Sequence, residues 1–186
     1  MPSPPLRLRY AVRAIERGGV IACPTEAVWG LSCDPDDPAA VARLLELKQR
    51  PVDKGLILVA SGLEQIAALL RGLSDAQRGK LALSWPGPTT WLLPHGDLVP
   101  PWIHGGRDTV AVRVTAHPVM AALCRAWDGP LVSTSANRAG CQAPRAAFQV
   151  QRYFGGQLDA LVPGAVGGAR RPSVIRDLRT DEVLRT

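Results

Sequence analysis

Apolar and polar positions along the chain form helical and strand-like segments in alternation. Apolar residues at three- and four-residue spacing predict helices, and short apolar runs bounded by turn residues predict strands. We expect helices at 6–15, 38–48, 63–70, 74–83, 119–127 and 145–154. We expect strands at 20–23, 56–60, 89–93, 109–114, 130–133 and 160–162, and a terminal hairpin made by 173–176 and 182–185.

This alternation predicts an α/β fold or a mixed sheet. Asp37 followed by Pro38 is a typical helix start, since Asp caps the first turn and Pro fits the first helical position. Pro51 is expected to end that helix. The apolar runs LILVA at 56–60 and LVS at 131–133 predict strands covered on both faces. With 186 residues, the chain is expected to form one domain over 1–186.

Composition favours a cytoplasmic protein. Hydrophobic residues make up 46% of the chain, yet none of its stretches approaches the ~20 apolar residues of a membrane helix. Residues 1–19 carry scattered charges and no apolar core of a secretion signal. The four cysteines include no C-x-x-C pair, which argues against a zinc ribbon or a disulfide framework. We therefore expect reduced cysteines and no membrane association.

The net charge of +6 suits an anionic partner such as nucleic acid or nucleotide phosphate, although charge alone identifies none. The chain has 19 Arg and only 3 Lys, and two of the lysines, Lys48 and Lys54, lie close together. A compact ammonium group binds phosphate as a point charge. This clustering hints at a phosphate site, and chance clustering is the alternative.

Several common catalytic motifs are absent. The sequence has no Walker phosphate loop, no G-x-G-x-x-G and no G-x-S-x-G nucleophile elbow. His95, His104 and His117 are not spaced as metal ligands. If the protein is an enzyme, we expect it to work by positioning substrates and stabilising charge, without a covalent nucleophile or a protein-bound metal.

Four polar segments follow or form expected strands, where open α/β sheets bind ligands. Each also has an ordinary structural explanation: a turn, cations at a helix C-terminus, a structural salt bridge, or a polar loop. That explanation accounts least well for Lys54, which lies beyond Pro51. Taken singly, none of them establishes a function. The segments are 24–30, 47–56, 109–114 and 133–137.

Taken together and in this order, these segments closely resemble the YrdC-like family, and within it the short bacterial TsaC branch. The resemblance runs from about Val20 to Arg185. It includes PTEAVWGL, LLELKQRPVDKGLIL, WPGPTT, VAVRV followed by HP, LVSTSAN and PSVIRD. Its most specific part is the combination of Lys48-x-Arg50 with Ser135-x-Asn137.

The resemblance implies a twisted open α/β sheet flanked by helices, with a positively charged concave surface that holds substrates and faces tRNA. It implies a nucleotidyltransferase, an L-threonylcarbamoyladenylate synthase, that condenses L-threonine, bicarbonate and ATP to threonylcarbamoyl-AMP and pyrophosphate. The product would serve threonylcarbamoyladenosine modification of tRNA next to the anticodon, through the TsaD/TsaB/TsaE machinery. Mg²⁺ would accompany ATP, with no tightly bound cofactor and no metal ligand from the protein.

The resemblance also assigns residues by position. Contacts with threonine are expected from Thr25, Arg113 and Ser173. The ATP or adenylate site is expected to contain Lys48, Arg50, Lys54, Thr109, Ser133, Ser135, Asn137 and Arg185. Of these, the catalytic group is Lys48, Arg50, Ser135 and Asn137. Thr90 is a weaker candidate.

Three departures from the family pattern are visible. Trp29 stands where relatives often have Tyr or Phe, a change that we expect the pocket to tolerate. Val59 stands where longer relatives carry a His near threonine. Residues 138–144 do not clearly supply a Ser that some relatives place near ATP.

Three other functions compete with this interpretation. A non-catalytic module of the same fold that binds double-stranded RNA or tRNA would suit the basic charge, but no RRM- or KH-like pattern is present. A carbamoyl-transfer domain of the hydrogenase-maturation type would carry C-x-x-C pairs, which are absent. A paralogous YrdC-like branch is disfavoured because both the Lys-x-Arg and the Ser-x-Asn pairs are present.

Overall fold

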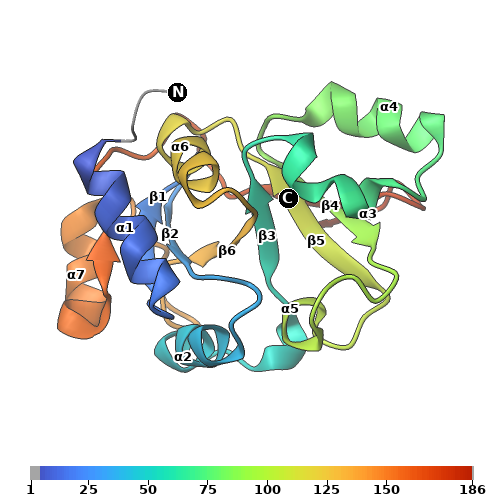
Figure 1. Ribbon diagram of the computed structural model, residues 1–186. Helices are drawn as coiled ribbons and strands as arrows, with labels where there is room; N and C mark the ends of the chain where they lie inside the picture. The colour runs from blue at the N-terminus through green and yellow to red at the C-terminus, as the bar shows by residue number, and fades with distance from the viewer. Residues whose placement is uncertain (1–4, 186) are drawn as a thin grey trace.

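The computed structural model describes residues 5–185, which form one nine-stranded sheet flanked by helices (Figure 1). The order across the sheet is β7-β1-β2-β6-β3-β5-β4-β8-β9. The strands are β1 (Ile21–Pro24), β2 (Trp29–Ser32), β3 (Ile57–Ala60), β4 (Thr89–Pro94), β5 (Thr109–Val114), β6 (Leu131–Ser135), β7 (Ala160–Leu161), β8 (Val174–Asp177) and β9 (Val183–Arg185). The ends of the predicted domain, residues 1–4 and 186, lie outside the described residues.

Helices and short 3₁₀ turns connect the strands. They are α1 (Leu6–Glu16), α2 (Pro38–Lys48), η1 (Val52–Lys54), η2 (Leu63–Ile66), α3 (Ala67–Leu70), α4 (Asp75–Ser84), α5 (Pro101–His104), α6 (Pro118–Trp127), α7 (Ala147–Phe154) and η3 (Gly155–Gln157). The predicted start of α2 is confirmed, because the Asp37 carboxylate accepts hydrogen bonds from the Ala39 and Ala40 amides. In the part of the chain that the structure describes, no helix combines the length and the apolar character needed to cross a membrane.

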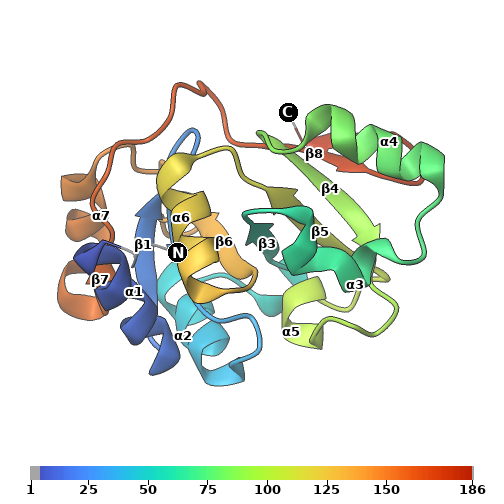
Figure 2. The ribbon, with the colours of Figure 1, turned by 45° about the horizontal axis from the view of Figure 1, so that its top comes forward.

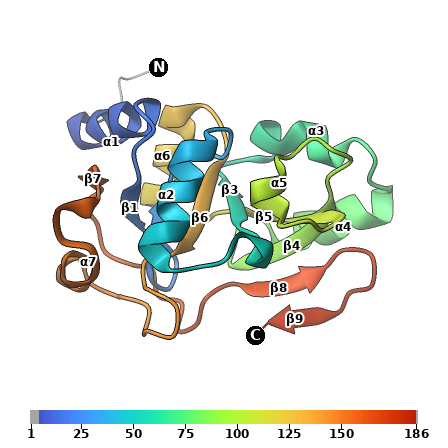
Figure 3. The ribbon, with the colours of Figure 1, turned by 90° about the horizontal axis from the view of Figure 1, so that it is seen from below.

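The sheet is mixed, as predicted. Strand β1 is parallel to β7, β3 to β5 and β4 to β8, whereas the remaining neighbours are antiparallel. The predicted terminal hairpin is confirmed as β8 and β9, which pair antiparallel. Figure 3 shows this hairpin at one edge of the molecule, away from α1.

Alternate residues along β1, β3 and β6 belong to two different apolar clusters. Ala22, Leu58, Val112 and Val132 join the larger cluster, to which α2, α3, α4, α5 and α7 contribute. Residues of the opposite parity, including Ile21, Val59 and Leu131, join a smaller cluster with α1 and α6. Figure 2 shows α1 and α6 over the β1 and β6 half of the sheet, and α3 and α4 beside β4.

The smaller cluster covers only part of its sheet face, so the prediction that LILVA and LVS are covered on both faces is wrong in part. Val59 and Leu131 are fully buried against α6. Ile57 and Ser133 have the same parity and pair with each other across β3 and β6, but both line an open pocket. One face of the sheet is therefore helix-covered at one end and free for ligands at the other.

Four other segment predictions differ from the structure. Residues 29–32 form a strand, whereas the sequence predicts only a polar segment at 24–30; the turn at 25–28 folds this strand back onto β1. Pro101–His104 is a short helix, started by two prolines, although no helix is predicted between the strands at 89–93 and 109–114. The predicted helix at 63–70 begins as a 3₁₀ turn. Ser135 ends β6 and pairs with Gly30, two residues beyond the predicted end of this strand at 133.

Candidate functional site

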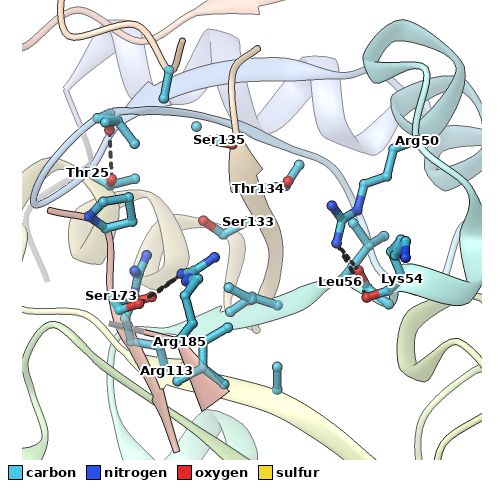
Figure 4. Close-up of a pocket in the computed structure, with 18 of the residues that line it drawn as sticks. Thr25, Arg50, Lys54, Leu56, Arg113, Ser133, Thr134, Ser135, Ser173 and Arg185 are labelled. Carbon is cyan, nitrogen blue, oxygen red and sulfur yellow. Dashed lines mark hydrogen bonds between the residues drawn. The ribbon is translucent and has the colours of Figure 1, made fainter. Parts of the chain in front are cut away.

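A pocket of about 430 Å³ occupies the uncovered part of the sheet face (Figure 4). Its floor is made by side chains of the same parity from β3, β5 and β6, among them Ile57, Ala111 and Ser133. Gly30 on β2 belongs to the same surface. A Cβ atom at Gly30 would lie 3.2 Å from the Thr134 carbonyl oxygen and 3.7 Å from Ser133 Oγ, so glycine leaves this part of the pocket open.

The structure brings together the predicted site residues except Lys48 and the weaker candidate Thr90, neither of which lines the pocket. The pocket is lined by Thr25, Arg50, Lys54, Thr109, Arg113, Ser133, Ser135, Asn137, Ser173 and Arg185. Figure 4 shows Arg113 and Arg185 beside Ser173, and Arg50 and Lys54 on the opposite side, with Ser133 and Thr134 between the two groups. Thr25 lies near the first group, and its hydroxyl donates to the Val28 carbonyl oxygen at 2.7 Å.

Lys48 lies beneath the loop that follows β6. Its side chain is 4% exposed, and its ammonium group donates to the backbone carbonyls of Ser135 and Asn137, the latter at 2.9 Å. Burial, together with the nearby Arg50 guanidinium, lowers the pKa of Lys48 to about 8. Lys48 therefore holds the Ser135–Asn137 loop in place, and its charge acts from behind that loop.

Arg50 reaches the pocket because α2 ends between it and Lys48. Gln49 adopts a left-handed backbone conformation with φ of 53°, so the chain turns away after the last helical residue. The Arg50 guanidinium donates to the Gly55 carbonyl oxygen at 3.0 Å, and its Nε is buried without a partner among the described residues. Burial and the charge of Arg107 lower the pKa of Arg50. The guanidinium thus keeps unused donors near the pocket.

Asn137 stands at the other side of this loop. Its side-chain amide donates to the carbonyl oxygens of Arg138 and Cys141, the latter at 2.7 Å. Its Oδ1 is buried and has no partner in the described part of the chain. The amide side chain thus closes the loop on itself and retains one acceptor at the pocket wall.

At the inner end of the pocket, which we define as Glu26, Arg113 and Ser173, an ion pair is almost fully buried. A guanidinium nitrogen of Arg113 lies 3.6 Å from Glu26 Oε2, and the side chains are 7% and 13% exposed. Glu26 Oε1 accepts hydrogen bonds from the Thr115 hydroxyl at 2.6 Å and the Ala116 amide at 3.2 Å. Burial alone would raise the pKa of Glu26, but Arg113 and these hydrogen bonds outweigh it and lower the pKa.

Ser173 joins the inner end of the pocket to the terminal hairpin through Arg185. Its hydroxyl oxygen accepts a hydrogen bond from Thr90 at 2.8 Å and another from Arg185 at 3.2 Å. Arg185 also donates to the Ser173 carbonyl oxygen at 2.8 Å. Burial, and then the charges of Arg113 and Arg50, lower the pKa of Arg185. Thr90, the weaker candidate, is fully buried and supports Ser173 from behind.

Two lining residues, His104 and Arg107, received no role from the sequence. Arg107 precedes β5 by two residues and has the same parity as Thr109 and Arg113, so extending the alternation backward would have found it. The His104 ring stacks on His95 with centroids 4.2 Å apart, and its Nδ1 is buried without a partner among the described residues. The sequence predicts no helix or strand at 101–104, so it gives no sign that His104 lies beside the pocket.

The departures from the family pattern have different structural consequences. Trp29 is buried in the larger cluster, on the side of β2 away from the pocket. Val59 is fully buried against α6 and contributes nothing to the pocket lining. Of residues 138–144, Cys141 and Ala143 line the pocket.

The charge of the lining is strongly one-sided. Its one carboxylate is Glu26, which is already paired, and its cations are Arg50, Lys54, Arg107, Arg113 and Arg185. Within residues 5–185, no group of three or more His, Cys, Asp or Glu side chains could hold a metal ion. The pocket can therefore bind two anionic groups, one at the inner end and one at the outer end, which we define as Arg50, Lys54 and Arg107.

Comparison with known sequences gives consistent matches over nearly the whole chain. A model of the Sua5/YciO/YrdC family, described as telomere recombination, matches residues 13–186. Threonylcarbamoyl-AMP synthase of Cellvibrio japonicus is 56% identical over 179 residues, which cover 96% of this chain and 95% of that protein.

Solved structures give the same picture. Sua5 of P. abyssi, in complex with L-threonine, superposes with a TM-score of 0.88 and 34% identity over 95% of this chain. The match covers 52% of that protein, so the present chain spans about half its length. E. coli YciO superposes with a TM-score of 0.85 and 25% identity, covering 99% of this chain and 91% of that one.

Proposed function

The chain belongs to the Sua5/YciO/YrdC family, and we propose that it is an enzyme that condenses L-threonine, bicarbonate and ATP to threonylcarbamoyl-AMP and pyrophosphate. This activity makes it a nucleotidyltransferase, an L-threonylcarbamoyladenylate synthase. The observation that carries the proposal is a single pocket with two separate cationic ends, in a chain 56% identical to proteins named for this product.

The inner end suits the amino acid. Arg113 is held by Glu26 and has little freedom to move, so its guanidinium is preorganised for a carboxylate. Ser173 and Thr25 add hydroxyl groups at the same end. Relatives of this fold include Sua5 of P. abyssi, which was solved with L-threonine bound. We assign Thr25, Arg113 and Ser173 to threonine on this basis.

The remaining polar residues suit the nucleotide. Arg50 and Lys54 lie opposite the inner end, with Ser133 between them and that end. Ser135 and Thr109 also line the pocket. Asn137 and Lys48 shape the loop above this surface. Arg185 hydrogen-bonds to Ser173, so it lies where the bound amino acid and the nucleotide would meet.

The chemistry follows from the charges. The uncharged amine of threonine and bicarbonate combine with loss of water to an N-carboxylate, which then attacks the α-phosphorus of ATP as the bond to pyrophosphate breaks. Both reactants are anions at that step, so the cations of the pocket reduce their repulsion and stabilise the transition state. The attacking carboxylate is already ionised, so the second step needs no general base.

We expect Mg²⁺ to bind to the pocket together with ATP. Magnesium prefers oxygen ligands and is commonly held by substrate phosphates together with one or two carboxylates. The one carboxylate of the lining, Glu26, is paired with Arg113. We therefore expect phosphate oxygens and water to coordinate the ion, with no ligand from this chain.

The partners beyond the small substrates stay predictions. These are tRNA, the TsaD/TsaB/TsaE transfer machinery and a cytoplasmic location. The basic charge of +6 suits tRNA. Direct binding of RNA is tested with the same purified protein that is used for the synthesis assay.

The experiment incubates the protein with Mg²⁺ and α-labelled ATP and resolves the adenylates quickly. We expect a new labelled adenylate and pyrophosphate that require both threonine and bicarbonate. Lys48→Ala and Arg50→Ala should nearly abolish both products while the proteins stay folded. Lys80→Ala is the matched control, because Lys80 is partly exposed, does not line the pocket and pairs only with Asp181 among the described residues.

Near-normal turnover in the Lys48 and Arg50 variants would contradict the site assignment. Folded wild-type protein that makes no adenylate but binds double-stranded RNA tightly would support the non-catalytic RNA-binding alternative instead.

A further inference from the structure

The exposed side of α1 carries a group of arginines that lack acidic partners. All of them are exposed, and none forms an ion pair with another described residue; they are Arg7, Arg9, Arg13 and, at the C-cap, Arg17. The one acidic residue of the helix, Glu16, is also exposed and is unpaired within residues 5–185. This side of the molecule therefore presents an excess of positive charge to solvent.

The stability of α1 does not explain this charge. The positive end of the helix dipole lies at the N-terminus, where Arg7 and Arg9 are unfavourable, and the first turn has no acidic residue to offset them. Arg13 and Arg17 interact favourably with the C-terminal end of the dipole, but they are like charges four positions apart and repel each other. An anion outside the helix would offset both unfavourable interactions.

Three of these arginines form a row along the helix. Arg9, Arg13 and Arg17 follow one another at intervals of four residues, so each lies about 6 Å further along the axis on nearly the same side. A row of cations matches a linear polyanion better than it matches a single small anion. The phosphates of a nucleic acid strand form such a polyanion, and a guanidinium group binds phosphate with two parallel hydrogen bonds.

A groove of about 380 Å³ adjoins this row and shares no lining residue with the substrate pocket. It is formed by α1, the loop that follows α1, α2 and the start of β7. Arg43 on α2 pairs with Asp159 at 2.5 Å, so the one carboxylate among the described lining residues is already neutralised. The cations of the groove that remain free for a ligand are Arg13 and Arg17.

Tyr10 adds an aromatic ring to the same groove. It is 59% exposed and lies three positions before Arg13, so the two side chains are neighbours on the helix surface. Proteins that bind single-stranded nucleic acid combine a cationic groove with aromatic rings on which bases stack. An acidic polypeptide would pair with the arginines but would leave the ring without a role. Tyr10 therefore favours nucleic acid over an acidic protein.

We propose that the exposed side of α1 and the adjoining groove form a second binding surface, separate from the substrate pocket, that holds the phosphate backbone of RNA. Arg9, Arg13 and Arg17 bind phosphates, and Tyr10 stacks on a base. The choice of RNA over DNA rests on the proposed function, whose product we expect to serve tRNA modification. Figure 3 shows α1 on the side of the molecule away from the β8–β9 hairpin, which borders the pocket, so RNA on α1 leaves the pocket open to its substrates.

The test measures binding of a fluorescently labelled RNA stem-loop by anisotropy, at several salt concentrations and without ATP or threonine. The double variant Arg13→Ala with Arg17→Ala should weaken RNA binding about 10- to 100-fold, because charge-assisted contacts to phosphate are lost. The slope of log K against log salt should become shallower by roughly 1.5, as expected for two lost phosphate contacts. Tyr10→Ala should weaken binding about 10-fold with the slope unchanged, since stacking neutralises no phosphate.

Two further variants separate charge at this surface from charge in general. Arg13→Lys with Arg17→Lys keeps both charges and should keep the slope at the wild-type value. Arg71→Ala with Lys80→Ala is the matched control, because it removes two positive charges from residues that line neither the groove nor the pocket. We expect its RNA affinity to stay within about 2-fold of the wild-type value, since exposed charges far from the RNA are screened.

Unchanged RNA affinity in the double variant Arg13→Ala with Arg17→Ala would overturn the proposal, and so would an equal loss in the matched control. Wild-type protein that binds a poly-glutamate peptide but no RNA would assign this surface to an acidic protein and would also overturn it. A wild-type protein that makes no adenylate, yet binds RNA through α1, would remove the proposed function and leave the surface standing.

Discussion

The inner and outer ends of the pocket are both cationic, yet they are built in opposite ways. At the inner end, Arg113 is 6% exposed and paired with Glu26, which is itself held by Thr115 and Ala116. At the outer end, Arg50 is half-buried, Lys54 and Arg107 are exposed, and none of the three is paired within residues 5–185.

The difference matters for selectivity and release. A buried, paired arginine has a fixed direction, so it can discriminate the shape and charge of a small substrate. Unpaired surface cations hold a flexible polyanion and let it leave, because water screens their attraction once it moves. The inner end is therefore suited to recognition, and the outer end to binding and release of phosphates.

The largest expected effect comes from breaking the inner ion pair. Arg113→Ala leaves Glu26 buried without its partner, which should cost about 3–5 kcal/mol of stability. Loss of the carboxylate contact should lower kcat/KM for threonine by roughly 100- to 1000-fold. Urea unfolding and steady-state kinetics measure the two effects separately.

The double variant Arg113→Met with Glu26→Gln separates stability from recognition. Removing both charges should restore much of the stability while threonine-dependent turnover stays low. Recovery of activity together with stability would show that Arg113 has only a structural role.

The next effect is at the outer end, where Arg50→Ala should behave differently. Because Arg50 has no acidic partner, its removal should leave the free energy of unfolding unchanged or slightly higher. Turnover should be nearly abolished, and the affinity for MgATP, measured by calorimetry without threonine and bicarbonate, should fall about 10- to 100-fold through loss of charge-assisted contacts. Binding of L-threonine, measured by calorimetry, should stay at the wild-type value. A rise in the threonine dissociation constant equal to that for ATP would contradict the separation of the two ends.

A pH titration sharpens the comparison at Lys48. Its pKa of about 8 lies below the usual value for lysine, so the ammonium loses its proton as pH rises through about 8. The affinity for MgATP, measured without threonine and bicarbonate, should fall by up to about 10-fold between pH 7 and pH 9. Lys48→Arg stays charged over this range and should give a flat profile. A flat profile for the wild type would show that the charge of Lys48 does not support nucleotide binding.

The smallest effect is expected at Thr90. Thr90→Val removes the hydrogen bond that orients the Ser173 hydroxyl, and neither atom carries a charge. A neutral hydrogen bond contributes about 0.5–1.5 kcal/mol, so the KM for threonine should rise about 2- to 10-fold with kcat unchanged. Ser173→Ala gives the reference value for complete loss of that hydroxyl. An effect of Thr90→Val on the KM for ATP would contradict its placement at the inner end.

The sequence predicted the elements whose pattern is local. The start of α2 at Asp37–Pro38, the strand at 109–114 and the terminal hairpin are all confirmed, since capping residues and alternation act over a few positions. The strand at 29–32 and the helix at 101–104 were missed. Each is only four residues long, too short to display a helical or alternating apolar pattern, and contacts with distant segments hold both in place.

The candidate site shows the same division. The resemblance identified most of the lining, including Arg50, Arg113 and Asn137. It did not show that Lys48 points under the loop, because one left-handed residue, Gln49, sends neighbours two positions apart in different directions. It gave no role to Arg107, which depends on a contact between Gly55 and Gly105 across fifty residues of chain.

The chain by itself determined which residue types are present, the order of helices and strands, and the excess of cations. Only the tertiary structure decided how those cations are divided between a paired inner end and an unpaired outer end. The physical reason is that pairing and burial depend on which atoms meet in space. Glu26 pairs with Arg113 because the turn after β1 lies beside the end of β5. Asp108, in contrast, pairs with Arg179 and not with its sequence neighbour Arg107.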